Sequence, residues 1–303
     1  MKNTSYSENL IKRVETAKPL SEEEYAKIFI SILPCIEEYD SSITIVKKFI
    51  ENSNFDGKLV DMLSIGAGTG NFEERIVREL NVNLNYIYAI EPNEGHVINL
   101  QNKLTNLDVN FDVDTSYFSS DYELNGSRTS GKTLHNDMKF DIVLISYSIN
   151  CFNNPCDIVN HASKFLRAGG KILIIHQGES AVSEVYSYLL INSDPQVFSA
   201  DKTISDMSIT DKIITSGMLE KYPELDVKTM EEPAYTLVDD FIRNNEDMAD
   251  RFNIVSLFLQ ANFLHLSEAS QKYVYDCISN TCSLIDNRYY MCHPVVGIIV
   301  SRP

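Results

Sequence analysis

Short apolar runs alternate with segments of helical spacing through the middle of the chain, and this alternation restricts the possible folds more than any other feature. The apolar runs predict strands over residues 59–65, 86–90, 109–113, 140–145 and 171–175. The segments between them predict helices over residues 72–80, 95–104 and 155–166, the last ended by Gly169 and Gly170. Strands that alternate with helices indicate a parallel sheet covered on both faces. We therefore predict a doubly wound α/β fold.

Further elements are expected toward both ends of the chain. Ser21 and Glu24 form a capping-box pattern, which predicts the start of a helix. A second helix is predicted near residues 42–53. Residues 180–290 have mostly helical patterns, and residues 294–300 are an apolar run that predicts a last strand.

The composition limits the classes of partner. The formal net charge is −17, and such a surface repels phosphate backbones, so we expect no nucleic-acid partner. No apolar run is long enough to span a bilayer and no secretory signal is visible, so we expect a cytoplasmic protein without a membrane partner. Cysteines and histidines do not cluster at metal-ligand spacing, so no metal site is expected.

Three glycines separate the first predicted strand from the helix that follows it. Gly66, Gly68 and Gly70 let the backbone turn tightly and let a ligand lie against it. The dinucleotide-binding fingerprint needs its third glycine one position later, where this chain has Asn71. The spacing therefore argues against a pyrophosphate cofactor.

Polar side chains close two of the predicted strands. Glu91 ends the second strand, beside the glycine loop of a doubly wound sheet, where its carboxylate can accept both hydroxyl hydrogens of a ribose. Ser146 and Tyr147 close the fourth strand. Because ligands of open α/β sheets bind outside the carboxyl ends of the strands, Tyr147 is expected to face the cleft. The alternative is that Tyr147 packs beneath the helix that follows it.

With these features the sequence resembles the class I S-adenosylmethionine-dependent methyltransferases and, within them, the histamine N-methyltransferase family. The resemblance runs from about Ser21 to the end of the chain and rests mainly on MLSIGAGTG at residues 62–70 and AIEPNEGH at residues 89–96. Weaker similarity occurs at residues 140–143, 170–175, 237–242 and 262–263 and in the terminal strand.

The resemblance implies a Rossmann-like, seven-stranded sheet with an antiparallel last strand, N-terminal helices and a helical insert that caps the substrate. It implies one methyltransferase domain over residues 1–303. Its expected parts are an N-terminal helical lid over residues 1–55, a cofactor-binding half over 56–180, a substrate cap over 181–290 and the last strand over 291–303.

The cofactor implied by the resemblance is S-adenosyl-L-methionine. Gly66 would lie against its methionine end, and Glu91 would bind its ribose. His96 replaces a polar residue that helps to hold the cofactor, and Ser119 or Ser120 would lie near the adenine. Gly68, Gly70 and Ser146 complete the expected cofactor site.

On the substrate side, the resemblance implies a glutamate of the first helix over a bound amine. Glu22 is the best match, with Glu23 or Glu24 as alternatives. Tyr147 falls where the family has glutamine, and His293 falls where it has asparagine. Both departures concern substrate recognition, so they argue against histamine itself as the substrate and not against methyl transfer.

Apolar side chains at helical spacing precede His293 in the chain. They are expected to form core first of all, and Phe263 is also expected to wall the substrate pocket. The members of this stripe are Phe252, Val255, Phe258, Leu259 and Phe263. His135 and His161 are expected at the surface.

The leading hypothesis is a monomeric enzyme that methylates a nitrogen of a small imidazole or amine, a class that includes cations. Such an enzyme aligns a lone pair with the methyl–sulfur bond and excludes water. Glu22 would pair with an ammonium group, and His293 or Tyr147 would accept or relay a proton. The alternative for His293 is a solvent-exposed residue that caps the last strand. The alternative functions are methyl transfer to a hydroxyl or carboxylate, and a non-catalytic binding or scaffold role.

Overall fold

The structure, a computed structural model, describes residues 20–21, 24, 27–28, 31, 37–55, 57–124, 138–180, 183, 211–243, 251–259 and 262–302. The chain divides into two compact units. The first, which we call the sheet unit, comprises Tyr39–Gln177, Asp211–Glu232 and Val295–Pro303. The second, which we call the insert unit, comprises Met1–Glu38, Gly178–Thr210 and Pro233–Pro294.

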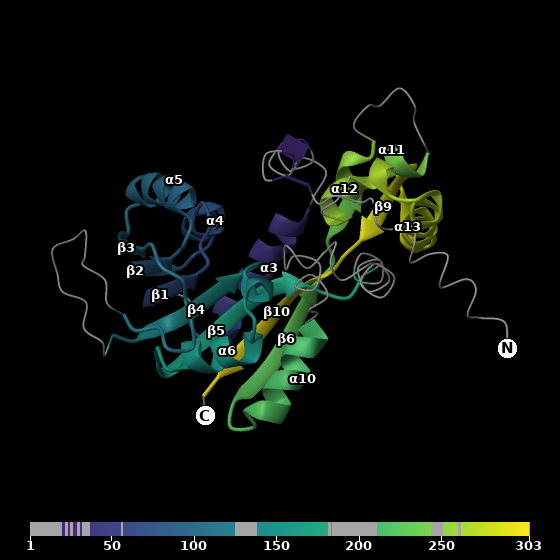
Figure 1. The fold of residues 1–303 in the computed structure, drawn as a ribbon. Coiled ribbons are helices and arrows are strands. Elements are labelled where there is room, and N and C mark those ends of the chain that lie inside the picture. The colour runs from purple at the N-terminus through teal and green to yellow at the C-terminus, as the bar shows by residue number, and fades with distance from the viewer. Residues whose placement is uncertain are drawn as a thin grey trace. The chain divides into compact units, whose positions relative to one another are not determined.

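A seven-stranded sheet forms the centre of the sheet unit (Figure 1). Its strands are β1 (Leu59–Ile65), β2 (Asn83–Ile90), β3 (Asn110–Asp114), β4 (Phe140–Ser146), β5 (Leu166–Gln177), β6 (Asp226–Glu232) and β10 (Val295–Ser301). Their order is β3-β2-β1-β4-β5-β10-β6. Strand β10 pairs antiparallel with both β5 and β6, whereas β1 to β5 pair parallel with one another. The predicted fold class, including an antiparallel last strand inside the sheet, is confirmed.

Helices cover both faces of this sheet. They are α3 (Glu38–Asn52), α4 (Asn71–Glu79), α5 (Glu94–Thr105), the short 3₁₀ helix η3 (Ile149–Cys151), α6 (Pro155–Ser163) and α10 (Asp211–Lys221). The right-handed crossovers from β1 to β3 and from β4 to β5 run in opposite directions along the sheet, so α4 and α5 lie on one face and α6 on the other. Helix α10 packs beside α6, where Tyr222, just after α10, donates a hydrogen bond to Asp157 of α6 over 2.5 Å.

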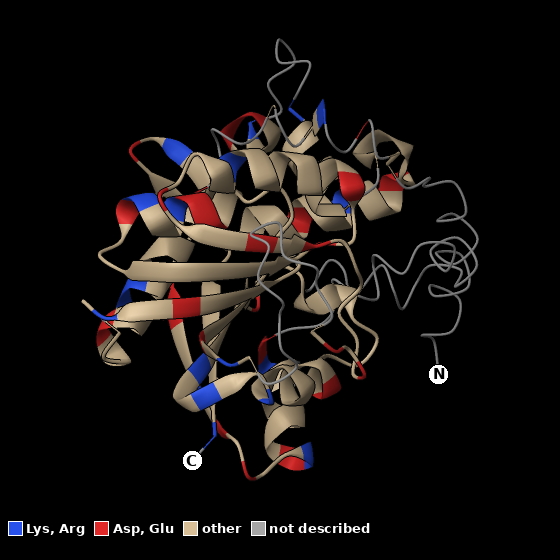
Figure 2. Cartoon of the chain, turned by 90° about the vertical axis from the view of Figure 1, so that its left-hand side faces the viewer, with Lys and Arg blue, Asp and Glu red and all other residues tan. Residues whose placement is uncertain are grey.

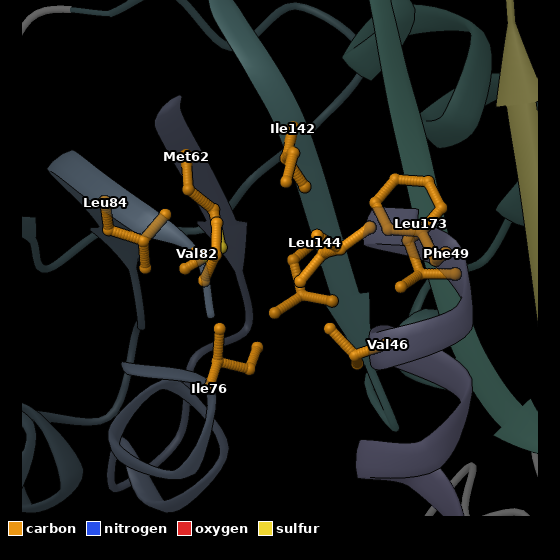
Figure 3. A pocket seen from close by; sticks show the side chains of 10 residues that line it. Val46, Phe49, Met62, Ile76, Val82, Leu84, Ile142, Leu144 and Leu173 are labelled. Atoms are coloured by element: carbon orange, nitrogen blue, oxygen red, sulfur yellow. The ribbon is translucent and has the colours of Figure 1, made fainter. Parts of the chain in front are cut away.

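Helix α3 packs its apolar face against the sheet, next to α4. A cavity of about 10 Å³ remains between these helices and the strands (Figure 3). Val46 and Phe49 of α3, Ile76 of α4 and Leu144 of β4 are among its lining residues. The space is no larger than one water molecule and its lining is apolar, so it is a dry gap in the core and not a ligand site.

Two glycines predicted to end a helix lie instead inside β5. Helix α6 ends at Ser163, and the pairing of β4 with β5 shifts register between Phe140 and Ile142. Gly169 has a φ of 78°, and a Cβ on Gly170 would lie 2.8 Å from the carbonyl oxygen of Phe140. The two glycines thus make a bulge in the strand, where the backbones come too close for a side chain.

The bulge carries an arginine between two aspartates. Arg167 Nη1 lies 2.6 Å from Asp141 Oδ2, and its Nη2 pairs with Asp61. Asp61 is 8% exposed. Figure 2 shows acidic residues on strands as well as on helices and loops. Arg167 compensates two of these strand acids and so joins β1, β4 and β5.

The insert unit contains a three-stranded antiparallel sheet of order β7-β9-β8. Its elements are β7 (Tyr235–Leu237), α11 (Asp239–Ile242), α12 (Asn253–Leu259), the 3₁₀ helix η4 (Phe263–His265), α13 (Glu268–Thr281), β8 (Cys282–Ile285) and β9 (Arg288–Cys292). At the start of the chain, Ser21 Oγ accepts from the backbone N–H of Glu24 over 3.2 Å, and Glu24 Oε2 accepts from that of Ser21 over 2.9 Å. The predicted capping box is therefore confirmed.

The prediction that residues 180–290 are mostly helical is wrong for four strands. Strand β6 lies at an edge and is largely exposed, so it lacks the apolar run of a buried strand. Strands β8 and β9 are joined by Asp286 and Asn287, whose φ angles of 48° and 62° are those of a tight hairpin turn. No helix in the described part of the chain is long and apolar enough to span a bilayer.

Candidate functional site

The glycine loop joins β1 to α4 at the carboxyl edge of the sheet. The N–H groups of Gly66 and Ala67 donate to the Ile90 carbonyl over 2.8 and 3.2 Å, which ties the loop to β2. A Cβ on Gly66 would lie 2.5 Å from Ser148 Cβ, whereas a Cβ on Gly68, at a φ of 55°, would meet nothing within 4 Å. Gly66 is therefore required by close packing, and Gly68 faces open space that a ligand can enter.

Glu91 lies beside this loop, as predicted. The side chain is 8% exposed. Its Oε2 accepts from the Gly68 N–H over 2.8 Å, and its Oε1 accepts from the Asn93 N–H over 2.9 Å. Each carboxylate oxygen has a further lone pair, so Glu91 can still accept the two hydroxyl hydrogens of a ribose.

Two more predicted residues border the loop. Gly70, with a φ of 77°, precedes the first residue of α4. His96 lies in the first turn of α5, where the Asn93 side chain caps its N–H and that of Gly95. The ring Nδ1 of His96 is 3.5 Å from Glu91 Oε1, and its side chain is 49% exposed. His96 therefore lies within reach of any group bound to Glu91.

The segment after β3 holds Ser119 and Ser120. Ser119 Oγ donates to Asp121 over 2.6 Å, a bond that lowers the pKa of the Asp121 carboxyl. Ser120 is exposed. Both serines thus lie in the sheet unit, in the segment that follows β3, and β3 is the neighbour of the strand that Glu91 ends.

An acidic residue that was not predicted ends β3. The backbone carbonyl of Asp114 accepts from the Glu91 N–H over 3.0 Å, so these residues end neighbouring strands. Asp114 Oδ2 accepts from the hydroxyls of Tyr88, over 3.1 Å, and Tyr122. Burial raises the pKa of both phenols, which therefore keep their protons for Asp114. An acid at the end of the third apolar run, as at the end of the second, was the available signal.

Strand β4 ends in a strained turn. Ser146 is its last residue, and Tyr147 has a φ of 51°, a conformation rare for a bulky residue. The Tyr147 N–H donates to the Ile175 carbonyl over 2.9 Å, and its hydroxyl lies 2.6 Å from Ser42 Oγ of α3. Tyr39 lies with its ring centroid 6.3 Å from that of Tyr147. These contacts hold the Tyr147 ring at the carboxyl edge of the sheet.

Ser148, also not predicted, follows this turn. Its hydroxyl donates to the Ile65 carbonyl over 2.9 Å and fills the space above Gly66. The end of β4 and the glycine loop are therefore in direct contact. The sequence offers no local signal for this contact, because the two segments are distant along the chain.

His293 lies in the insert unit and is only 1% exposed. Its Nε2 is 2.5 Å from Thr236 Oγ1, and the Phe258 ring centroid lies 5.8 Å away. Its Nδ1 has no hydrogen-bond partner among the described residues. Burial lowers the pKa of His293 to about 4, so the ring is neutral at pH 7. The alternative of a solvent-exposed strand cap is wrong.

Phe263 lies in the core of the insert unit, 5% exposed. Its ring stacks on Phe252 at 5.1 Å and meets Phe241 edge-on at 5.4 Å. The rest of the predicted stripe packs in the same core. Glu22 and Glu23 lie outside the described residues.

Two other predicted positions have different outcomes. Glu24 is engaged by Ser21 in the capping box, which lowers the pKa of the Glu24 carboxyl. The prediction of a surface position is wrong for His161, which is 9% exposed, because its Nε2 bonds to the Tyr122 carbonyl at 2.9 Å and its ring packs 5.5 Å from Phe118. His135 lies outside the described residues.

Solved structures share the fold of this chain. A protein from Bacillus halodurans proposed to be a methyltransferase matches with a TM-score of 0.51 and 15% identity, over 86% of this chain and 99% of that one. The plantazolicin methyltransferase BamL, in complex with a triazolic desmethylPZN analog and S-adenosylhomocysteine, matches with a TM-score of 0.51 and 13% identity, over 98% and 95%. This chain shares the fold of these methyltransferase structures.

A further plantazolicin methyltransferase, BpumL, solved with S-adenosylhomocysteine, matches with a TM-score of 0.50 and 11% identity over 99% of both chains. No family model matches the sequence. No curated protein matches it in sequence. The similarity to methyltransferases is therefore one of fold.

Proposed function

We propose that this chain transfers a methyl group from S-adenosylmethionine to a nitrogen of a small imidazole or amine. The observation that carries the proposal is the hydrogen bond of 2.8 Å from the Gly68 N–H to the Glu91 carboxylate, at a glycine that faces open space. A carboxylate held beside an open loop at the carboxyl edge of the sheet suits a nucleoside with free ribose hydroxyls. The shared fold with structures that contain S-adenosylhomocysteine supports the same cofactor here.

The residues present fit this cofactor. The open space at Gly68 admits a ligand against the backbone, and Glu91 retains lone pairs for the ribose. Neighbouring strands are about 4.8 Å apart, so a base attached to that ribose would extend over β3 toward Asp114, Ser119 and Ser120. His96 would reach the ribose side, and Gly66, Gly70 and Ser146 would border the methionine end.

The bound cofactor would supply a methyl group already activated by its sulfonium charge. The protein then has to orient the acceptor's lone pair and exclude water. Tyr147, fixed by α3 and by β5 next to the glycine loop, is proposed to orient the acceptor. His293, neutral and with an unpaired Nδ1 among the described residues, is proposed to accept or relay a proton.

Glu22 is proposed to pair with an ammonium group of the acceptor, and Phe263 to contribute apolar surface. An amine or imidazole is favoured because the chain has a net charge of −17, which attracts cations. The acceptor proposed is therefore a small basic molecule rather than a nucleic acid.

Two measurements test the proposal. Calorimetry should show that S-adenosylhomocysteine binds the full chain, and a melting scan should show that it raises the Tm. A panel of imidazoles, amines, phenols and carboxylates, incubated with methyl-labelled S-adenosylmethionine, should yield labelled product from basic nitrogens. Absence of binding would overturn the proposal, and label only on oxygen acceptors would overturn its choice of nitrogen.

A further inference from the structure

A buried carboxyl lies directly behind the glycine loop. Glu73, in the first turn of α4, has an exposed fraction of 0%. Its Oε1 accepts a hydrogen bond from Ser64 Oγ over 2.5 Å. Ser64, in β1, is itself 1% exposed. The other carboxyl oxygen of Glu73, Oε2, is buried with no hydrogen-bond partner among the described residues.

This bond connects the two ends of the glycine loop. Ser64 lies two residues before Gly66, the first loop glycine, and Glu73 lies three residues after Gly70, the last. Inside the loop, the Gly70 N–H donates to the Ala67 carbonyl over 3.1 Å. The side-chain bond therefore ties the strand end of the loop to its helix end, and the conformation of Gly68 depends on both ends.

The surroundings of Glu73 oppose a negative charge on it. Burial is the largest effect and raises the pKa of its carboxyl, and the charge of Glu91 acts in the same direction. Lys103 of α5 acts in the opposite direction, but its ammonium group is bonded to the Asn71 side chain. The Ser64 hydroxyl is the one side-chain hydrogen bond found for Glu73 in the described part of the chain. Burial therefore raises the pKa of the Glu73 carboxyl, and the hydrogen bond from Ser64 lowers it by a smaller amount.

We propose that Glu73 is a positioning residue for the cofactor, which fixes the glycine loop by joining α4 to β1 through Ser64. The inference rests on the proposed function, because the loop is the part of the site that faces the cofactor. Glu73 is too buried to touch the cofactor itself. It acts through Ser64 and through the placement of the Gly68 N–H, which reaches Glu91.

The test compares S-adenosylhomocysteine affinity, measured by calorimetry, in four variants of the full chain. Glu73→Ala and Ser64→Ala each remove the bond and should weaken binding about tenfold. Glu73→Gln keeps the shape and charge of the neutral acid and should bind within about twofold of wild type. Glu74→Gln is the matched control, because Glu74 is next to Glu73 in the chain but pairs with Arg78 at the surface. This variant should bind S-adenosylhomocysteine as wild type does.

A pH series separates positioning from a purely structural role. The pKa of Glu73 is raised by the fold, so the neutral acid is favoured at low pH and is lost as pH rises through that pKa. Wild-type affinity should therefore fall with rising pH more steeply than that of Glu73→Gln, which cannot ionise.

Three outcomes would overturn the inference. One is wild-type affinity in both Glu73→Ala and Ser64→Ala. Another is a Glu73→Gln variant that is folded yet binds as weakly as Glu73→Ala, or as weakly as Ser64→Ala if Glu73→Ala does not fold. The third is the same pH dependence in wild type and Glu73→Gln. Failure of the proposed function has a different signature, since wild type would then not bind S-adenosylhomocysteine at all, and both proposals would be overturned.

Discussion

Glu91 is the residue on which cofactor affinity should depend most. Replacing it with alanine removes a carboxylate that accepts from Gly68 and that would accept from the ribose. We expect S-adenosylhomocysteine binding to weaken by about 1–3 kcal/mol, the range of charge-assisted hydrogen bonds. Calorimetry measures the loss, with Glu94→Gln, on the exposed first turn of α5, as the control. Equal affinity in wild type and Glu91→Ala would remove Glu91 from the cofactor site.

His293 should make stability depend on pH in the acidic range. Its pKa in the fold, about 4, lies below the ordinary value of 6.5. The neutral ring therefore stabilises the fold above about pH 6.5, and this contribution is lost as pH falls toward 4, because the unfolded chain takes up the proton first. Urea unfolding should show that the unfolding free energy falls more in wild type than in His293→Gln as the pH is lowered, by up to about 3 kcal/mol. Parallel pH profiles would contradict the buried neutral ring.

Tyr147 should affect turnover and not cofactor binding. Tyr147→Phe removes the hydroxyl, whereas Ser42→Ala keeps that hydroxyl and removes one partner within hydrogen-bond distance of it. If the hydroxyl relays a proton, Tyr147→Phe should lower kcat about tenfold or more, while Ser42→Ala should keep most activity. Equal losses in both variants would indicate that the bond only orients the ring. S-adenosylhomocysteine affinity should stay near the wild-type value in both.

Local patterns made part of the site predictable. Gly66 and Glu91 were found because each follows an apolar strand, and the fold then brings strand ends together. Ser148 was missed because its contact with Ile65 joins segments that are distant along the chain. Asp114 was missed although its position directly after the third apolar run was a local signal. His161 was misplaced because a histidine gives no signal of burial, which here depends on the carbonyl of Tyr122.

At the scale of elements, the bulge of β5 should matter for stability. Arg167→Met keeps the side-chain stem but leaves Asp61 and Asp141 uncompensated. We expect a loss of about 1–3 kcal/mol in unfolding free energy, less than for a fully buried pair because Arg167 is 42% exposed. Urea unfolding measures it. The control is Arg78→Met, whose pair with Glu74 lies on the surface of α4 and should contribute at most about 0.5 kcal/mol.

Buried strands were easier to predict from the sequence than exposed ones. Strand β1 was predicted with its observed bounds because six of its seven residues are buried, so its sequence is apolar apart from Asp61 and Ser64. Strand β6 was missed because charged residues occupy the exposed face of an edge strand. The β8–β9 hairpin was missed because Asp286 and Asn287 were not recognised as turn residues that tolerate positive φ.

At the scale of the whole molecule, charge should influence which acceptors are used efficiently. A net charge of −17 raises the local concentration of cations, an effect that salt screens over about 8–10 Å. We expect kcat/KM for a cationic amine to fall several-fold between low and physiological salt. A neutral acceptor of similar size should show little change, and equal salt dependence for both would argue against electrostatic attraction of the substrate.

The place of β10 in the sheet has a consequence for biosynthesis. This strand is the last of the seven to leave the ribosome, yet it lies between β5 and β6. Until it emerges, β5 presents an open edge and β6 has no neighbour to pair with. The hydrophobic edge of β5 therefore stays open to pairing with other polypeptides while residues 178–294 are translated.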